Sequence, residues 1–460
     1  MIIEQYYLDC LSLASYLVGD EESGIAAVID PQRDIDHYLA DAEAMGLRIE
    51  RVLLTHIHAD FASGHLEMRA RTGATIHLGA ALEPEFSSEA VRHGDRIRLG
   101  KLELEILETP GHTPESICIV VMDPESARPH AVFTGDTLFI GAVGRPDLLV
   151  SVGRTQEEMA GHLYDSLHEK VLALPDSTIV YPGHGAGSAC GKNLSTDRFS
   201  TIGDQRRLNC SLQFDSRDDF IAELTQGQPA IPAYFAFDAM FNRQDHPTLD
   251  ETLAVALQPL PVDRAIEFCA DGAQLLDTRA PDVHAVAHLV GSVNVGLGGR
   301  FASWAGTVLD MDRPVVLVAD PGTEKEAAIR LGRIGFDNVI GYVDDIAAIL
   351  TDRPELVREA RRIEVGEAAA LVGGASPPLV LDVRNPGERE VSHIEGSAHI
   401  PLIELEARAD ELPGGREILV HCASGYRSSI AASLLRRRGL GSPLDLAGGI
   451  QAWDASVARK

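Results

Sequence analysis

Short apolar runs separated by glycine and proline mark the first 250 positions of the chain. Residues 52–54 and 24–31 are two such runs, the second ended by a proline, and both are typical of buried strands. Residues 34–46 have the pattern of an amphipathic helix that stops at a glycine. Strand and helix follow one another, which predicts a layered α/β fold for this part of the chain.

Four of the predicted strands lead into residues of the kind that bind metal ions. The strand at 52–54 leads into the motif His-x-His-x-Asp, and the strands at 102–107, 131–133 and 179–180 each lead through a glycine to one more such residue. These residues are His56, His58, Asp60, His112, Asp136 and His184. Histidine and carboxylate together bind first-row transition metals, and strand ends are where ligands sit in layered folds. One such site alone could be an ordinary loop, but four in order predict a metal centre.

The second half of the chain contains an internal repeat. Asp277 and Asp382 open the same Asp-x-Arg motif 105 positions apart, and His288 and His393 open the same His-x-x-Gly-Ser motif with the same separation. A fixed offset over two separate motifs indicates duplicated domains. Strands and helices alternate in each copy, so we expect two small α/β domains.

The second copy carries a candidate nucleophile. A predicted strand over 417–422 ends at Cys422, a short loop with Gly425 and Arg427 follows, and Ser428 is expected to open a helix. Free N–H groups at a helix N-terminus, with a glycine that closes the loop into an anion-binding nest, lower the pKa of a thiol. The planar fork of Arg427 suits an oxyanion such as sulfite. The alternative is a buried structural cysteine at a strand end.

The first copy lacks this nucleophile. Its strand at 314–319 is followed by Asp320, where the second copy has its cysteine. A carboxylate in an anion-binding nest would repel sulfite. We therefore expect residues 255–350 to form a domain without catalysis. A silent copy is easiest to explain if it builds an interface, so we also expect a homo-oligomer.

Length and charge limit the classes of function. At about 150 residues per domain, 460 residues suggest about three domains, which we place at 1–250, 255–350 and 360–460. The net charge of −29 works against binding to nucleic acid or anionic membranes. No apolar run approaches the ~20 residues that span a bilayer, and the start of the chain does not resemble a signal peptide. The six cysteines form no Cys-x-x-Cys pair, so we expect a cytoplasmic protein with reduced thiols.

The metal-type motifs carry a resemblance to a known family. The order H-x-H-x-D, P-G-H-T, G-D-T and P-G-H-G over residues 1–250 resembles the metallo-β-lactamase fold, an αββα sandwich. Residues 134–139, 144–147 and 199–203 resemble its persulfide dioxygenase branch in particular. The resemblance implies oxidation of a low-molecular-weight thiol persulfide, with glutathione, coenzyme A or a similar thiol as carrier, by O2 to sulfite and thiol. It also implies a part in hydrogen sulfide detoxification.

The same resemblance implies one Fe(II) per chain, with His56, His112 and Asp136 as its ligands. Two histidines and one carboxylate with open positions are the signature of non-haem Fe(II) oxygen chemistry. The groups that would orient these ligands and tune the metal are His58, Asp60 and His184.

Phe61 distinguishes the predicted dioxygenase from the two-metal hydrolases of this fold. Hydrolases of this fold, such as glyoxalase-II-type thioesterases, resemble one another in a motif H-x-H-x-D-H that holds two metals, and Phe61 stands where the last histidine would be. A phenyl ring cannot ligate, so a second ion should bind weakly. The alternatives are a mononuclear zinc hydrolase that also uses His58, and a glyoxalase-II-like zinc thioester hydrolase fused to a sulfur-carrier module.

Arg145, in a glycine-rich turn beyond Asp136, has two interpretations. Its guanidinium either clamps an anionic thiol carrier or forms a structural ion pair with Asp147. We assign Arg145 to substrate binding and keep the ion pair as the alternative.

Residues 360–460 are similar to rhodanese, through Asp-x-Arg, His-x-x-Gly-Ser, Cys-x-x-Gly-x-Arg and the closing segment 445–453. Rhodanese is a sulfurtransferase whose loop cysteine carries a persulfide. The resemblance implies that Cys422 takes sulfane sulfur and passes it to sulfite, giving thiosulfate, while Gly425 and Arg427 bind the anion. Residues 255–350 would be rhodanese-like in fold only. The alternative is that both copies serve as a persulfide relay or docking module.

Overall fold

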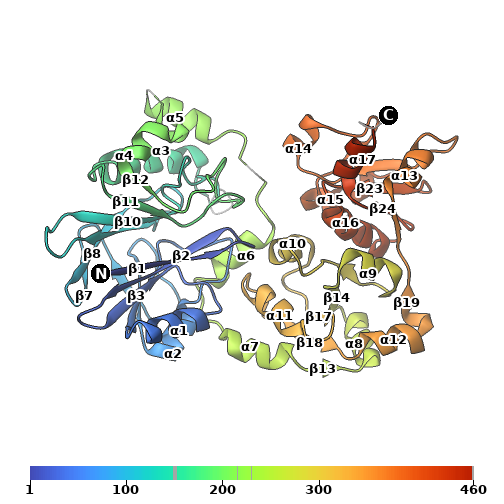
Figure 1. Cartoon of the computed structure of the whole chain (residues 1–460), viewed down its shortest axis with the longest axis horizontal. Helices are drawn as coiled ribbons and strands as arrows, with labels where there is room; N and C mark the ends of the chain where they lie inside the picture. Colours follow the sequence, from blue (N-terminus) through green and yellow to red (C-terminus); the bar gives the residue numbers. More distant parts are fainter. Residues whose placement is uncertain (149–152, 215, 229, 458–460) are drawn as a thin grey trace. The chain divides into compact units, whose positions relative to one another are not determined.

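The structure is a computed structural model, which describes residues 1–148, 153–214, 216–228 and 230–457. The chain folds into two compact units, drawn in Figure 1. The first unit holds Met1–Leu249 together with Gly332–Gly335, and the second holds Asp250–Leu331 and the chain from Phe336 onward. The finer boundaries at 255–350 and 360–460 stay predictions.

Two six-stranded sheets form the frame of the first unit within the described residues. The first sheet follows the chain in the order β1 (Ile2–Leu8), β2 (Leu13–Asp20), β3 (Ile25–Ile29), β4 (Arg48–Leu53), β5 (Thr75–Gly79) and β6 (Glu89–Val91). The second sheet has the order β12 (Ser200–Thr201), β11 (Ile179–Pro182), β10 (Pro129–Gly135), β9 (Ile117–Met122), β8 (Leu102–Glu108) and β7 (Arg96–Leu99). β3 to β6 pair in parallel, and so do β10 and β11, whereas β7, β8, β9 and β10 pair antiparallel in turn.

Helices cover the outer face of each sheet, as Figure 1 shows for α1 and α2 below one sheet and α3 to α5 above the other. The helical segments of this unit are α1 (Asp36–Ala44), α2 (His65–Thr72), α3 (Gln156–Ser166), the π-helical turn η2 (Leu167–Val171), α4 (Ile202–Leu208), η3 (Cys210–Leu212), α5 (Arg217–Leu224) and α6 (Tyr234–Phe241). The predicted helix at 34–46 is therefore confirmed as α1, which begins two residues later than expected and is followed by Gly46 at φ +69°.

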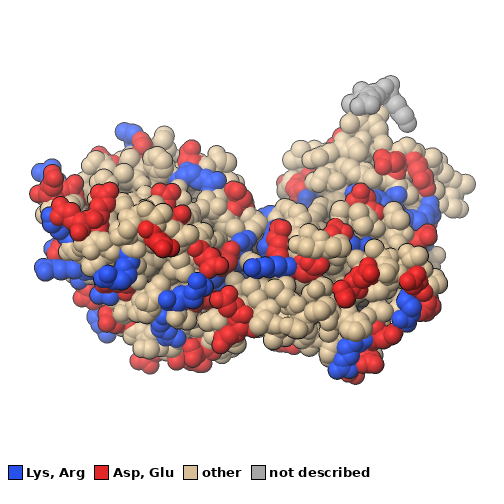
Figure 2. Space-filling model, turned by 60° about the horizontal axis from the view of Figure 1, so that its bottom comes forward, with Lys and Arg blue, Asp and Glu red and all other residues tan. Residues whose placement is uncertain are grey.

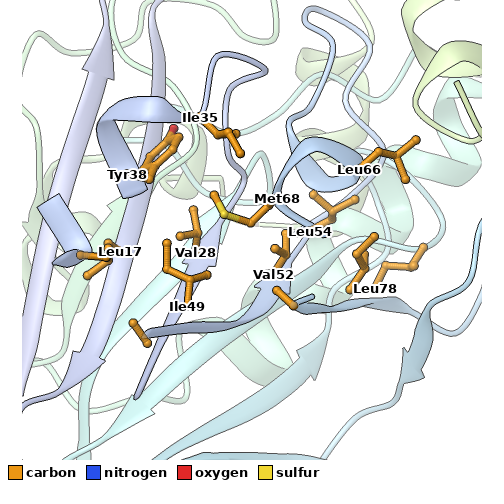
Figure 3. Packing of buried hydrophobic residues seen from close by; sticks show 14 of the residues in the cluster. Leu17, Val28, Ile35, Tyr38, Ile49, Val52, Leu54, Leu66, Met68 and Leu78 are labelled. Atoms are coloured by element: carbon orange, nitrogen blue, oxygen red, sulfur yellow. The ribbon is translucent and has the colours of Figure 1, made fainter. Parts of the chain in front are cut away.

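Alternating side chains of the strands build three apolar layers. Ile106 of β8 packs between the two sheets, and its neighbour Leu107 packs on the opposite face against α3 and α5. Such alternation follows from the two-residue period of a strand. The third layer lies between the first sheet and helices α1 and α2, where Val52 of β4, Tyr38 of α1 and Met68 of α2 belong to one buried cluster, as Figure 3 shows. The order helix, sheet, sheet, helix results.

The second unit contains two parallel five-stranded sheets with the same topology. The first has the order β13 (Pro259–Leu260), β18 (Val339–Val343), β17 (Val315–Val318), β14 (Gln274–Asp277) and β16 (Val293–Asn294). The second has the order β20 (Arg361–Ile363), β24 (Leu444–Leu446), β23 (Ile418–His421), β21 (Leu379–Asp382) and β22 (Ala398–His399). A separate pair joins β15 (His288–Leu289) to β19 (Val357–Arg358).

The helical segments of this unit lie around these sheets. They are α7 (Leu249–Ala256), α8 (Val262–Ala270), α9 (Pro281–Val286), α10 (Phe301–Val308), α11 (Glu324–Gly332), α12 (Ile346–Asp352), η4 (Pro354–Leu356), α13 (Val365–Val372), α14 (Pro386–Val391), α15 (Leu402–Arg408), η5 (Ala409–Glu411), α16 (Tyr426–Arg437) and α17 (Gly449–Val457).

The identical strand order confirms the internal repeat. Asp277 ends β14 and Asp382 ends β21, and each carboxylate forms a buried ion pair with the arginine two positions later, Arg279 or Arg384. The Asp-x-Arg motif thus fixes the same turn in both copies.

The first copy holds the helix that follows Cys422 in the second. The Asn294 backbone N–H donates to Oγ of Ser433 at 3.0 Å, and Oγ of Ser429 donates to Oδ1 of Asn294 at 2.7 Å. The hydroxyl of Tyr426 donates to the carbonyl oxygen of Gly296 at 2.6 Å. Because Asn294 is fully buried, these bonds form part of the core between the copies.

Charges of both signs are mixed on the surface. Figure 2 shows Asp and Glu interspersed with Lys and Arg over the visible face. In the described part of the chain, none of the helices combines the length and the apolar character needed to cross a membrane.

Candidate metal centre and thiol site

Two histidines and a carboxylate meet where strands of both sheets end. His56 follows β4, His112 follows β8 and Asp136 follows β10. Oδ2 of Asp136 lies 3.4 Å from Nε2 of His112 and 3.9 Å from Nε2 of His56. All three side chains are buried, and one donor atom from each lies within 4.8 Å of the others. The structure thus brings together the three residues that the sequence predicts as ligands.

Hydrogen bonds from Nδ1 aim both imidazoles at this point. Nδ1 of His112 lies 2.9 Å from the carbonyl oxygen of Arg145, so it carries the proton. Nδ1 of His56 lies 3.0 Å from Oγ1 of Thr55, whose own hydroxyl donates to Oδ2 of Asp30 at 2.7 Å. Oγ1 of Thr55 therefore accepts from the ring. Both histidines are left with the Nε2 lone pair free for a metal ion.

A second group of donors lies beside the first. His58, Asp60 and His184 also place one donor atom each within 4.8 Å of the others. Nε2 of His184 lies 3.3 Å from Oδ2 of Asp60 and 3.6 Å from Oδ1 of Asp136, while its Nδ1 lies 3.1 Å from the carbonyl oxygen of Ser12. The carboxylate of Asp136 is therefore shared between the two groups.

Unpaired polar atoms indicate that this site fits a cation. Both carboxylate oxygens of Asp136, Oδ1 of Asp60 and Nε2 of His184 are buried and have no hydrogen-bond partner among the described residues. A buried oxygen or nitrogen without a partner costs free energy that a bound cation removes. The donor set of imidazole and carboxylate suits a transition metal.

The role of the second group stays a prediction. We expect His58, Asp60 and His184 to orient ligands, but their geometry could also hold an ion of their own. Phe61, buried and with its ring centre 4.3 Å from that of His58, adds no donor there.

Burial and neighbouring charges set the protonation of the histidines. Burial, with help from His58 and His112, holds the pKa of His56 well below its ordinary value, so its imidazole is neutral and ready to ligate. Burial also acts to lower the pKa of His184, but the carboxylates of Asp60 and Asp136 raise this pKa overall.

The Cys422 loop is closed around its sulfur. Sγ of Cys422 accepts a hydrogen bond from the backbone N–H of Gly425 at 3.1 Å. Gly425 has φ +96°, a left-handed conformation that favours glycine. The helix after the loop begins at Tyr426 rather than at Ser428, because the left-handed Gly425 itself serves as its N-cap.

Arg427 lies near Cys422 but already has a partner. Its Nη1 and Nη2 donate to Oε2 and Oε1 of Glu388 at 2.7 and 2.6 Å. Burial acts to lower the pKa of Arg427, but the hydrogen bonds and charge of Glu388, with the Cys422 sulfur, raise this pKa overall. Arg427 lies in the first turn of the helix rather than in the loop where the sequence predicts it, and its partner Glu388 was not indicated by the sequence. Its part in binding the anion stays a prediction.

The matching loop of the first copy is filled by its own carboxylate. The backbone N–H of Gly322 donates to Oε2 of Glu324 at 2.9 Å, and the N–H of Thr323 donates to the carbonyl oxygen of Asp320. This loop carries no thiol. Its geometry agrees with a copy that does not bind sulfite.

Comparisons with known proteins match this architecture. Residues 9–184 match the family model of the metallo-beta-lactamase superfamily, and residues 364–456 match that of the rhodanese-like domain. Over 208 residues the chain is 33% identical to "Persulfide dioxygenase ETHE1, mitochondrial" of Mus musculus. This match covers 45% of this chain and 74% of that relative. The chain belongs to the metallo-beta-lactamase superfamily. The predicted αββα sandwich is thereby confirmed, as is a rhodanese domain at the C-terminal end.

Relatives within the metallo-beta-lactamase superfamily carry different names. A hydroxyacylglutathione hydrolase of a Polaromonas species is 32% identical over 243 residues, covering 47% of this chain and 87% of that protein. A solved structure of a metallo-beta-lactamase from Staphylococcus aureus subsp. aureus COL is similar with a TM-score of 0.63 and 32% identity, covering 74% of this chain and 98% of that one. Membership shows a metal-binding fold and leaves the reaction open.

Sequence reasoning missed Cys190, which lies beside Asp136 and His184 at the candidate metal centre. Its sulfur forms a third group of candidate donors with Asp136 and His184. Burial, together with the charges of Asp60 and Asp136, raises the pKa of this thiol well above its ordinary value. Cys190 follows His184 at a spacing that matches no ligand motif, so only the fold reveals it.

Arg145 forms hydrogen bonds within the N-terminal unit, close to the candidate metal centre. Its Nε and Nη2 donate to Oδ1 and Oδ2 of Asp147 at 2.7 and 2.8 Å, and its Nη1 donates to the carbonyl oxygen of Ala189 at 2.9 Å. The side chain is buried. This geometry favours the structural ion pair, and the substrate clamp stays a prediction.

Proposed function

We propose that the N-terminal unit is an Fe(II)-dependent persulfide dioxygenase that produces sulfite. We propose further that the C-terminal rhodanese domain transfers sulfane sulfur to this sulfite. The observation that supports the first half is the buried group of His56, His112 and Asp136, with both imidazoles aimed at one point. Iron(II) bound there would supply open coordination positions and the activation of O2. The natural substrate would be the persulfide of glutathione, coenzyme A or a similar thiol.

The proposed oxidation balances without a further cofactor. A thiol persulfide, O2 and water give thiol, sulfite and two protons, so the outer sulfur is oxidised and O2 is reduced. The residues of this chain hold the ligand tautomers through the carbonyl oxygen of Arg145 and the hydroxyl of Thr55. His184 lies between the carboxylates of Asp60 and Asp136, which raise its pKa although burial acts to lower it.

The proposed transfer uses Cys422 twice. Its thiolate attacks the outer sulfur of a second persulfide, the S–S bond of the donor breaks, and the donor thiolate leaves with the bonding pair. The sulfur lone pair of sulfite then attacks the outer sulfur carried by Cys422, and the cysteine thiolate leaves as thiosulfate forms. This two-step exchange predicts ping-pong kinetics. The first copy, with the same strand order, would be a rhodanese-like domain without this chemistry.

A second candidate function is a glyoxalase-II-like thioester hydrolase with two metals. The observation that favours it is the second donor group of His58, Asp60 and His184. Two assays distinguish the functions. With glutathione persulfide, an oxygen electrode should record one O2 consumed per sulfite formed. A separate hydrolysis assay with a hydroxyacylglutathione thioester should show no cleavage. Thioester hydrolysis without O2 uptake would favour the hydrolase.

Replacing Phe61 with histidine should raise the number of bound metal ions from one towards two per chain. The new imidazole would add a donor beside His58, next to Asp60 and His184, and a further ligand strengthens a weak site. Metal content after dialysis checks this result. Phe220→His, which replaces a buried phenylalanine of the layer between the second sheet and its helices, is the control for burying an imidazole. Unchanged metal content in a folded Phe61→His protein would contradict the interpretation.

A further inference from the structure

The anion-binding arginine of the thiol site is already occupied by a carboxylate of the same domain. Both terminal nitrogens of Arg427 donate to the two oxygens of Glu388 in the parallel arrangement by which guanidinium binds an oxyanion. The side chain of Arg427 is 14% exposed and that of Glu388 36% exposed. An incoming sulfite therefore meets a guanidinium whose Nη1 and Nη2 already donate to Glu388.

Trp304 of the first copy lies beside the guanidinium of Arg427. Cζ of Arg427 lies 6.0 Å from the centre of the Trp304 ring, within the range of a cation–π contact. The Trp304 ring thus lies over one face of the guanidinium, and Glu388 occupies the edge formed by Nη1 and Nη2. Competition for the edge follows from this placement.

Glu388 has a second partner that would keep it in place after release. It is the third residue of α14, and its Oε2 also accepts the backbone N–H of Asn385 at 3.1 Å in a capping box. At 36% exposure, the side chain of Glu388 is also accessible to water. Leaving Arg427 therefore does not strand a buried charge.

We propose that Glu388 is an internal counter-ion which competes with anionic acceptors for Arg427, and so sets the selectivity of the Cys422 site between anionic and neutral sulfur acceptors. The proposal rests on the sulfurtransferase function proposed above. Sulfite would replace the carboxylate at Arg427 before it attacks the sulfur on Cys422. A neutral thiol such as dithiothreitol would not need this exchange.

The test compares Glu388→Gln with Glu390→Gln in the full chain. Glutamine keeps the capping bond to Asn385 but removes the charge that competes, and Glu390 is an exposed residue of the same helix. The KM for sulfite should fall about fivefold in Glu388→Gln, the size expected for a partly exposed ion pair. The KM for dithiothreitol should stay unchanged, and Glu390→Gln should behave as wild type.

Sulfate binding provides a readout that does not depend on transfer. The chain has two tryptophans, Trp304 and Trp453, so in a Trp453→Phe background the fluorescence reports on Trp304 beside Arg427. Sulfate, titrated against sodium chloride of equal ionic strength, should bind about fivefold more tightly when Glu388 is Gln.

The outcomes separate this proposal from the one it rests on. Unchanged sulfite KM and sulfate affinity in Glu388→Gln, equal changes in Glu390→Gln, or a raised sulfite KM would each overturn it, the last because Glu388 would then position Arg427 rather than compete for it. Tighter sulfate binding in a protein that makes no thiosulfate would support the competition and overturn the sulfurtransferase function.

Discussion

Replacing His112 with alanine is expected to lower O2 uptake with glutathione persulfide by about 10³-fold or more, with loss of most of the bound iron. His112 supplies one of three proposed ligands, and its Nε2 lies 3.4 Å from Oδ2 of Asp136. A bound metal contributes several kcal/mol to such a reaction, and each 1.4 kcal/mol is about tenfold in rate. Measuring O2 uptake and iron content on the same preparation checks the result.

The control for the His112 variant is His93→Ala, which removes an exposed histidine of the same unit. This variant should keep its iron and its O2 uptake. Because thiosulfate formation from added persulfide and sulfite depends on Cys422, it should survive in both proteins. Near-normal O2 uptake by His112→Ala would show that the ligand set is wrong.

Replacing Cys422 with serine should abolish thiosulfate formation while leaving O2 uptake unchanged, so that sulfite accumulates instead. Serine keeps the size of the side chain, but its hydroxyl is a far weaker nucleophile at neutral pH and does not carry a persulfide. The backbone N–H of Gly425 can still bond to the serine oxygen, so the loop should keep its shape. Ion chromatography of sulfite and thiosulfate gives both readings in one assay.

A matched thiol control for the Cys422 variant is Cys210→Ser, since Cys210 is exposed and belongs to the other unit. It should produce thiosulfate at the wild-type rate. Thiosulfate output that persists in Cys422→Ser would favour the alternative in which the rhodanese copies only relay or dock persulfides.

Patterns of local sequence predicted the frame of the protein. The alternation in β8 and the apolar run in β4 gave strands, because a two-residue period and a short buried run report directly on burial. The strand ends also located His56, His112 and Asp136, since strands of a layered fold deliver their loops to a common edge. Cys422 was predictable for the same reason.

Contacts between distant segments could not be predicted. Glu388 reaches Arg427 from 39 positions away, and Cys190 approaches Asp136 only because their two loops fold together. The start of α16 was placed two residues late because Gly425 begins the helix by its left-handed backbone, and no capping side chain marks that point. Such features depend on tertiary structure and leave no periodic signal.

The first copy has a clear place within the chain. Asn294 ties it to Ser429 and Ser433 on the helix that follows Cys422, and Trp304 lies against Arg427. A copy without a nucleophile can thus support the site of its neighbour. The expected homo-oligomer stays a prediction beside this role.

Metal content is the most direct test of the central claim. Protein purified without added metal salts should contain about one iron and little zinc per chain by mass spectrometry, and the same sample should consume O2 with glutathione persulfide. Two zinc ions per chain, together with thioester hydrolysis and no O2 uptake, would contradict the account.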